Sequence, residues 1–378
     1  MHYLDHNATS PLRDESRAAM EHALAIGGNP SSVHGRGRAA RAAVERAREQ
    51  VAALAGARVQ DTIFTSGGTE ANALALFGAV QGAAEAGARI TRLFVSEIEH
   101  DSVLANAAAL AERVPGLRLE HIPVTSDGVV DLEALRVQLR EGKGRALVAV
   151  MAANNETGVI QPVAEVADLI KEHEACLFVD AVQAAGKIAL STAAAHYLSL
   201  SAHKLGGPEG VGALIAREEA PFAAAILGGG QERGRRAGTE NVAGIAGFGA
   251  AASAAEPIGP ALRDRFESEL TSSFPEVAIF GVRAPRLPNT SNFSLPGIAA
   301  ETAVMALDLD GVMVSSGSAC SSGKVRPSHV LRAMGVPDAI ASTALRVSFG
   351  WNSTEADVDA ALSSLNRLVA RAKSRAAA

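Results

Sequence analysis

Cysteine is nearly absent from this sequence. Cys176 and Cys320 are the only cysteines in 378 residues, too few to form a disulfide framework. The stretch from Met1 to His6 also lacks the apolar core of a signal peptide. We therefore expect a protein of the reducing cytoplasm.

The sequence also lacks an excess of positive charge and a membrane-length apolar run. The formal net charge of -6 excludes the positive field that sequence-independent nucleic-acid binding requires, so we expect no nucleic-acid partner. The longest weakly polar stretch, Val242 to Ala255, is shorter than the roughly 20 residues that span a bilayer, so we expect no membrane partner. The basic stretch from Arg36 to Arg48 has apolar residues at helical spacing, and we expect its arginines to form a solvated helix face.

The composition is that of a globular protein, with 48% hydrophobic and 20% charged residues. Between Thr62 and Ala216, short β-rich runs alternate with helical patterns, which predicts an α/β fold with a mostly parallel sheet. The expected strands are residues 62–65, 92–96, 117–122, 146–151, 175–180, 197–201 and 211–216. The expected helices between them are residues 69–81, 101–113, 131–141 and 162–173.

After Gly244 the pattern changes and predicts a second, smaller domain. A long alanine-rich helix is followed by two short strands at 277–280 and 291–295, then by a helix, a strand and a closing helix over 354–373. The length of the chain also favours two domains. We expect a large α/β domain at 13–245, and a small α+β domain made of 1–12 and 246–378.

Polar residues follow five of the predicted strands, directly after each strand ends. In an open α/β sheet, ligands bind at the carboxyl ends of the strands. Each of these segments alone is an ordinary turn or helix cap, but together they predict a binding crevice. The segments are 66–69, 97–100, 154–156, 180–183 and 201–204.

Lys204 is the central residue of this predicted crevice. Lysine occurs only at positions 143, 171, 187, 204, 324 and 373, and only lysine among basic side chains forms a Schiff base with a carbonyl. A lone lysine after a strand is usually an ordinary loop residue. Asp180 changes that interpretation, because a carboxylate in a crevice needs a cationic or protonated partner. A pyridinium nitrogen meets that need, so the pair indicates pyridoxal phosphate.

Two further segments fit such a cofactor. The glycines of residues 65–70 begin a helix, whose N-terminal N–H groups suit a phosphate, although the same pattern is also ordinary capping. His100 could stack on the ring and move protons, although a histidine at a helix start is more often a cap.

A second reactive group is Cys320, which lies among small residues in the segment 315–323. An accessible thiol in such a loop is a liability unless its thiolate is used, and the alternative is a tolerated surface thiol. Cys176 lies in an apolar strand, and we expect it to be inert core.

Taken together, these residues resemble the cysteine desulfurases of the NifS and IscS type, in the class V aminotransferase group of pyridoxal-phosphate enzymes. The resemblance covers nearly the whole chain. It rests on residues 3–9, 65–72, 99–100, 154–158, 180–183, 201–212, 236–241 and 315–320. It implies the aminotransferase fold type I, with a mostly parallel seven-stranded sheet flanked by helices and a smaller α+β domain that carries a compact catalytic cysteine loop.

The resemblance also implies a role for each site residue. Lys204 would hold the cofactor aldehyde, Asp180 the ring nitrogen and Gln183 the ring hydroxyl, while His100 would stack on the ring. The implied phosphate ligands are Gly68, Thr69, Ser201 and His203, with Thr239 from the other subunit of a homodimer. Asn155, which also counts among the cofactor contacts, and Arg346 would bind the substrate. Gly350-Trp351 follows Arg346 where many relatives have Gly-Arg, so the shape of the entrance is in question.

The implied reaction converts L-cysteine to L-alanine and leaves a persulfide on Cys320. An iron–sulfur scaffold protein is the implied acceptor. No resident metal is expected, although Cys320 would contact an iron–sulfur cluster during transfer. Selenocysteine lyase or another class V aminotransferase reaction remains an alternative. A non-enzyme alternative is a catalytically inactive sulfur carrier or scaffold-binding protein.

Overall fold

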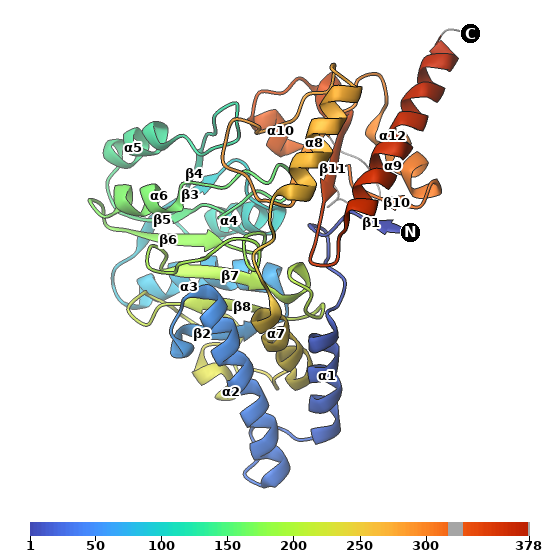
Figure 1. Ribbon diagram of the computed structural model, residues 1–378. Helices are drawn as coiled ribbons and strands as arrows, with labels where there is room; N and C mark the ends of the chain where they lie inside the picture. The colour runs from blue at the N-terminus through green and yellow to red at the C-terminus, as the bar shows by residue number, and fades with distance from the viewer. Residues whose placement is uncertain (317–327, 377–378) are drawn as a thin grey trace.

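A seven-stranded sheet forms the centre of the larger part of the molecule (Figure 1). The computed structural model describes residues 1–316 and 328–376. The strand order is β2-β8-β7-β6-β5-β3-β4, and β8 alone runs antiparallel to its neighbours. The strands are β2 (Thr62–Thr65), β3 (Ile90–Ser96), β4 (Arg118–Ile122), β5 (Arg145–Ala149), β6 (Ala175–Asp180), β7 (Tyr197–Ser201) and β8 (Gly212–Ala216).

The mostly parallel α/β fold predicted from the sequence is confirmed. Each of the seven strands predicted for this sheet occurs, with ends that differ by a residue or two. The central strands are buried along most of their length, for example at Leu147 and Phe178, as expected of strands covered on both faces.

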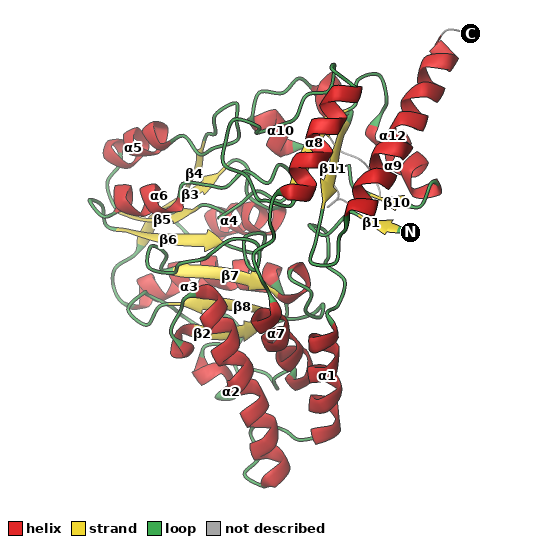
Figure 2. Ribbon diagram, in the orientation of Figure 1, coloured by secondary structure: helices red, strands yellow, loops and turns green. Residues whose placement is uncertain are grey.

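Helices cover both faces of the sheet (Figure 2). One face packs against α2, α5, α6 and α7, and the other packs against α3 and α4, so that each face has its own hydrophobic cluster. The helices of this part are α1 (Asp14–Ile26), α2 (Gly35–Ala55), α3 (Gly68–Glu85), α4 (Asp101–Arg113), α5 (Leu132–Glu141), α6 (Val163–Ile170) and α7 (Val242–Ala254). Asp131 caps α5 by accepting hydrogen bonds from two backbone N–H groups.

The expectation of a solvated arginine face on α2 is wrong for Arg48. Its guanidinium is buried and donates to both carboxylate oxygens of Glu232. Glu232 also accepts from the backbone N–H of Phe64, in β2. The spacing of apolar residues does not reveal that an arginine is buried, because the burial of Arg48 depends on Glu232, which is distant in the sequence.

A second group of elements has its own hydrophobic cluster, which includes Leu4 near the N-terminus. Strand β11 pairs antiparallel with β9, and β1 pairs in parallel with β10, so Figure 1 shows the N-terminus beside C-terminal elements. These elements are β1 (His2–Tyr3), α8 (Ala261–Ser273), β9 (Thr290–Ser294), α9 (Ala300–Leu309), β10 (Val312–Met313), β11 (Ala344–Ser348) and α12 (Glu355–Ala376). The short helices α10 (His329–Ala333) and α11 (Asp338–Ala341) pack in a separate cluster with Ile98 and Met151. The strand predicted at 277–280 is only a single bridge between Ile279 and Phe293.

The division into two domains stays a prediction, and we propose one change to it. Residues of α7, including Phe248 and Ala251, belong to the cluster on one face of the large sheet. We therefore propose that the large domain extends beyond residue 245 to the end of α7. Within the described residues, no helix is long and apolar enough to cross a membrane.

Candidate active site

One cavity of about 350 Å³ lies where the carboxyl ends of β6 and β7 meet the start of α3. It brings together most of the residues that we singled out from the sequence. Those residues are Gly68, Thr69, His100, Asn155, Asp180, Gln183, Ser201, His203, Lys204 and Arg346. The remaining lining residues were given no role from the sequence: Asn7, Ala8, Asn72, Ser102, Met151, Ala153 and Val182.

Lys204 ends a short 3₁₀ turn that follows β7 directly. Its Nζ donates to the backbone carbonyl oxygens of Asn7 and Ala8, at 2.7 Å each. The N-terminal segment therefore holds the amine at the floor of the cavity, although it is far from Lys204 in sequence.

Asp180 is the last residue of β6 and is only 5% exposed. Its Oδ1 accepts from the backbone N–H of Val182, and its Oδ2 accepts from Nδ2 of Asn72 at 2.7 Å. Both hydrogen bonds come from neutral donors. A protonated ring nitrogen would supply the positive charge that a buried carboxylate needs as a partner.

Glu99 is a second buried carboxyl group that acts on Asp180. Its Oε1 accepts from the backbone N–H of Met151, and its Oε2 has no hydrogen-bond partner among the described residues. Burial, reinforced by the charge of Asp180, raises the pKa of Glu99 well above its ordinary value. Burial and the nearby carboxylate therefore both favour the protonated form of Glu99.

The start of α3 fits a phosphate group. Gly67 is the N-cap residue, and glycine has no side chain with which to cap the first N–H groups of the helix. Gly68 lies so close to Ser201 that an added Cβ would come 3.3 Å from the Ser201 Cβ. His203 is held by Thr9, and burial and the charge of Lys204 lower the pKa of its imidazole to about 4, so it is neutral near pH 7.

His100 is both a helix cap and a cavity residue. Its Nδ1 accepts from the backbone N–H of Ser102 at the start of α4. A neutral imidazole that accepts at Nδ1 carries its proton on Nε2. Capping and stacking on a bound ring are therefore compatible roles for this side chain.

Arg346 reaches the cavity from β11, in the second group of elements. One Nη donates to Oδ1 of Asp5 at 2.6 Å, and the other donates to the backbone carbonyl of Asn155 at 3.0 Å. Its Nε is buried and has no partner within the described residues. An arginine held in this way presents a fixed cation at the cavity wall, which suits a substrate carboxylate.

Asn7, Asn72, Asp5 and Lys187 were missed as contributors to the site. The segment Tyr3 to Thr9 contributed to the resemblance, but no role was derived for its members. Residues 65–72 also contributed to the resemblance, but among them only Gly68 and Thr69 were assigned a role. Lys187 lies in no motif that the sequence distinguishes.

Thr239 and Cys320 are the predicted site residues that this cavity does not include. Thr239 is exposed on a different surface, near Ser66 and Arg236. Cys320 lies outside the described residues. Trp351 packs under the guanidinium of Arg13 and donates to the carbonyl of Pro11, so it does not line the cavity entrance.

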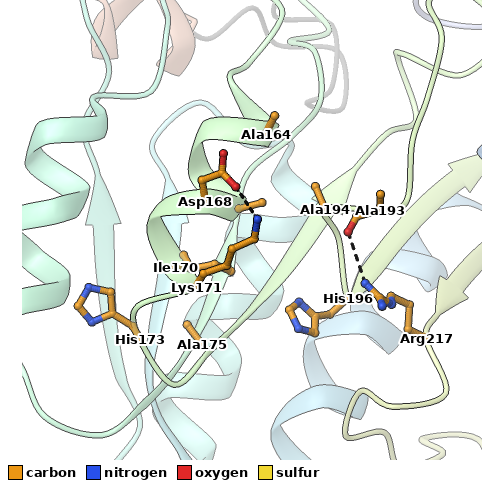
Figure 3. A pocket seen from close by; sticks show the side chains of 11 residues that line it. Ala164, Asp168, Ile170, Lys171, His173, Ala175, Ala193, Ala194, His196 and Arg217 are labelled. Carbon is orange, nitrogen blue, oxygen red and sulfur yellow. Dashed lines mark hydrogen bonds and ion pairs between the residues drawn. The ribbon is translucent and has the colours of Figure 1, made fainter.

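A larger cavity, of about 470 Å³, lies at the amino ends of β6 and β7 (Figure 3). There, Lys171 pairs with Asp168, and Arg217 donates to the carbonyl of Ala193. In an open α/β sheet, chemistry is expected at the carboxyl edge, so position rather than size favours the smaller cavity.

A lysine, a buried aspartate and an arginine gathered at the carboxyl edge of a mostly parallel sheet are features expected of the active site of an α/β enzyme. The sequence model of the aminotransferase class-V family matches residues 2–361, and this chain belongs to that family.

Named relatives agree with this assignment. The chain is 45% identical over 375 residues to a cysteine desulfurase of Cereibacter sphaeroides, covering 97% of this chain and 95% of that protein. It is 41% identical over 378 residues to the cysteine desulfurase IscS of Dictyoglomus turgidum, covering 97% and 94%. A solved structure of a NifS-like protein superposes with a TM-score of 0.88 at 36% identity, covering 98% of this chain and all of that chain.

Proposed function

We propose that this chain is a cysteine desulfurase that binds pyridoxal phosphate, removes sulfur from L-cysteine and carries it as a persulfide on Cys320. The observation that carries the proposal is the single cavity shared by Lys204, Asp180, His100 and Arg346. The desulfurase names of its relatives support the choice of this reaction over others of the family.

The residues of the cavity fit the proposed cofactor. Asp180 supplies a buried carboxylate for the ring nitrogen, and Lys204 supplies an amine for the aldehyde. The first turn of α3, with Ser201 and His203, supplies donors for the phosphate. Bound pyridoxal phosphate would supply an electron sink for the pair released when the substrate loses its Cα proton.

The chain's own groups then bind the substrate and move its protons. Arg346 and Asn155 would hold the carboxylate of L-cysteine, and the fixed guanidinium sets the orientation of the Cα–H bond. Lys204, whose Nζ lies in the cavity, would be the group that takes and returns the Cα proton.

The sulfur step needs a thiolate at Cys320. The thiolate attacks the substrate sulfur, one S–S bond forms and the substrate Cβ–S bond breaks, with its electron pair remaining on carbon. Protons from the site complete L-alanine, so that cysteine and the enzyme thiol become alanine and the enzyme persulfide. Atoms and electrons balance without an external oxidant.

The proposal extends to partners. We propose a homodimer, in which Thr239 reaches the phosphate of the other subunit, and an iron–sulfur scaffold protein as acceptor. The scarcity of cysteine keeps the cytoplasm as the proposed compartment. Selenocysteine is the alternative substrate, since the same groups would bind it.

Mass spectrometry of Cys320 tests this proposal. After incubation of the pyridoxal-phosphate-loaded protein with L-cysteine, we expect one added sulfur on the Cys320 peptide and an equivalent of alanine. Lys204→Ala abolishes both products, Cys320→Ala abolishes the adduct and slows alanine formation, and Cys176→Ala is the matched thiol control with both retained. Alanine formation at the wild-type rate by Cys320→Ala would rule out the persulfide step. Parallel incubation with L-selenocysteine distinguishes the alternative.

A further inference from the structure

Lys187 is a second lysine of the site, and the proposed function gives it no role. Its side chain is buried, with 4% of the residue exposed. Its Nζ donates to Oδ1 of Asn7 and to Oε1 of Gln183, at 2.8 Å each. A lysine is almost never this buried unless it is paired, and here both partners are neutral amides.

Asn7 connects this lysine to Lys204. Its backbone oxygen accepts from Nζ of Lys204 at 2.7 Å and from Nε2 of Gln183 at 2.8 Å. Its side-chain Nδ2 donates to the backbone carbonyl of Asn155 at 3.2 Å. One asparagine therefore contacts Lys187 and three residues that line the cavity.

Lys187 also helps to fix which way two amide groups face. An amine donor turns the oxygen of each amide toward itself, so the Nδ2 of Asn7 and the Nε2 of Gln183 face the other way. Nε2 of Gln183 uses one N–H on Asn7, and its second N–H is left for a ring hydroxyl. The bond from Gln183 Nε2 to the Asn7 carbonyl and the bond from Asn289 Nδ2 to the Asn7 Oδ1 favour the same two orientations, and Lys187 adds one more donor to each amide oxygen.

The charges around Lys187 favour its neutral form. Burial, followed by repulsion from Lys204 and Arg346, lowers its pKa well below the ordinary value. A neutral amine has two N–H groups, which matches its two hydrogen bonds. Lys187 can then donate to both amides without placing a second full cation beside Lys204.

We propose that Lys187 is a positioning residue for the site: through Asn7 and Gln183 it holds the amine of Lys204 and the amide of Gln183 in the places where the cofactor binds. This inference rests on the proposed use of pyridoxal phosphate, and it does not depend on the sulfur chemistry. Lys187 acts through its neighbours and touches neither substrate nor cofactor.

The test compares full-length wild type with Lys187→Met, which keeps the apolar stem and removes both donors. Cofactor-depleted protein is mixed with pyridoxal phosphate, and capture is followed by visible absorption. We expect capture to slow by about tenfold, the effect of one or two lost buried hydrogen bonds. We also expect the pH midpoint of the visible band of the loaded protein to shift. Borohydride trapping and peptide mass spectrometry should still place the label on Lys204.

Lys171→Met is the matched control, because Lys171 is exposed and pairs with Asp168 far from the cavity. It should leave capture and the pH midpoint unchanged. A purely structural role for Lys187 would lower the thermal midpoint and leave the pH midpoint unmoved, which would overturn the inference. If Lys187→Met does not fold, Lys187→Gln retains one donor group and should give a smaller shift in the same direction; wild-type behaviour of that variant also overturns it. Wild-type protein that captures no cofactor would instead refute the proposed function.

Discussion

Arg346 already has a carboxylate partner inside the protein, Asp5, before any substrate binds. Its guanidinium is planar, and its two terminal nitrogens are held in different directions by Asp5 and Asn155. Lysine at this position would keep the positive charge but would lose the planar pair of terminal nitrogens. We expect Arg346→Lys to raise KM for L-cysteine by about tenfold or more, with a smaller effect on kcat, measured as alanine formation.

Arg332→Lys is the matched control for that substitution, because Arg332 forms an exposed surface pair with Asp338. It should leave both constants unchanged. An unchanged KM in Arg346→Lys would remove Arg346 from substrate binding.

Lys187 also makes the stability of the fold depend on pH in a defined direction. Its folded pKa lies well below the unfolded value of 10.5, so between these values the unfolded chain binds one more proton than the native protein. The free energy of unfolding therefore rises with pH in that window, by up to about 1.4 kcal/mol per pH unit. Lys187→Met lacks this contribution. We expect wild type to gain stability relative to Lys187→Met as the pH rises toward 10.5 in urea unfolding. A constant difference would mean that Lys187 stays charged in the fold.

Local pattern predicted some of these residues and could not predict others. Lys204 and Asp180 each follow a strand, and strand ends in a parallel sheet converge at one edge, so their meeting could be predicted. Asn7 and Lys187 meet only because the N-terminal segment crosses from the second group of elements to the large sheet. No periodicity carries that information.

At the scale of elements, the first turn of α3 packs closely against the residues at the carboxyl ends of β6 and β7. An added Cβ on Gly68 would lie 3.0 Å from a methyl of Val182 and 3.3 Å from Cβ of Ser201. Gly68→Ala should therefore push the helix start away from Ser201. We expect the Kd for pyridoxal phosphate to rise by about tenfold, and the Kd for pyridoxal, which lacks the phosphate, to change little.

Gly259→Ala is the control for Gly68→Ala, because an added Cβ there meets no atom within 4 Å among the described residues. It should leave both dissociation constants unchanged. Equal weakening of pyridoxal and pyridoxal phosphate by Gly68→Ala would argue against a phosphate site at α3.

The helices and strands could be predicted where the sequence has a clear apolar run or helical spacing. The buried strands and their flanking helices are marked by apolar runs and helical spacing, and each predicted strand of the large sheet is present. The stretch 277–280 has the same apolar character but forms one bridge, at Ile279. A short apolar run becomes a strand only if a neighbour pairs along it, and a sequence does not state which neighbour is available.

At the scale of the whole molecule, the N-terminal segment joins the two groups of elements. Strand β1 pairs with β10, and a few residues later Asn7 contacts Lys204 and Thr290. Lysine and arginine of the site thus come from different groups, Lys204 from the large sheet and Arg346 from β11. The relative placement of the two groups is therefore part of the site geometry.

The exposed position of Thr239, away from the cavity of its own chain, leads to a prediction about the assembly. If Thr239 completes the site of a partner subunit, Lys204→Ala and Thr239→Asp fall in the same site of a mixed dimer, so that the other site is intact. Each homodimer alone should be inactive or strongly impaired. Random mixing of equal amounts, after reversible dissociation, should restore about a quarter of the wild-type alanine formation. Mixing Lys204→Ala with Asp180→Ala is the control and should restore none by this route, since both residues belong to one chain's cavity and every site keeps a damaged copy. Absence of recovery with Thr239→Asp, in a mixture shown to contain mixed dimers, would place Thr239 outside the partner's site.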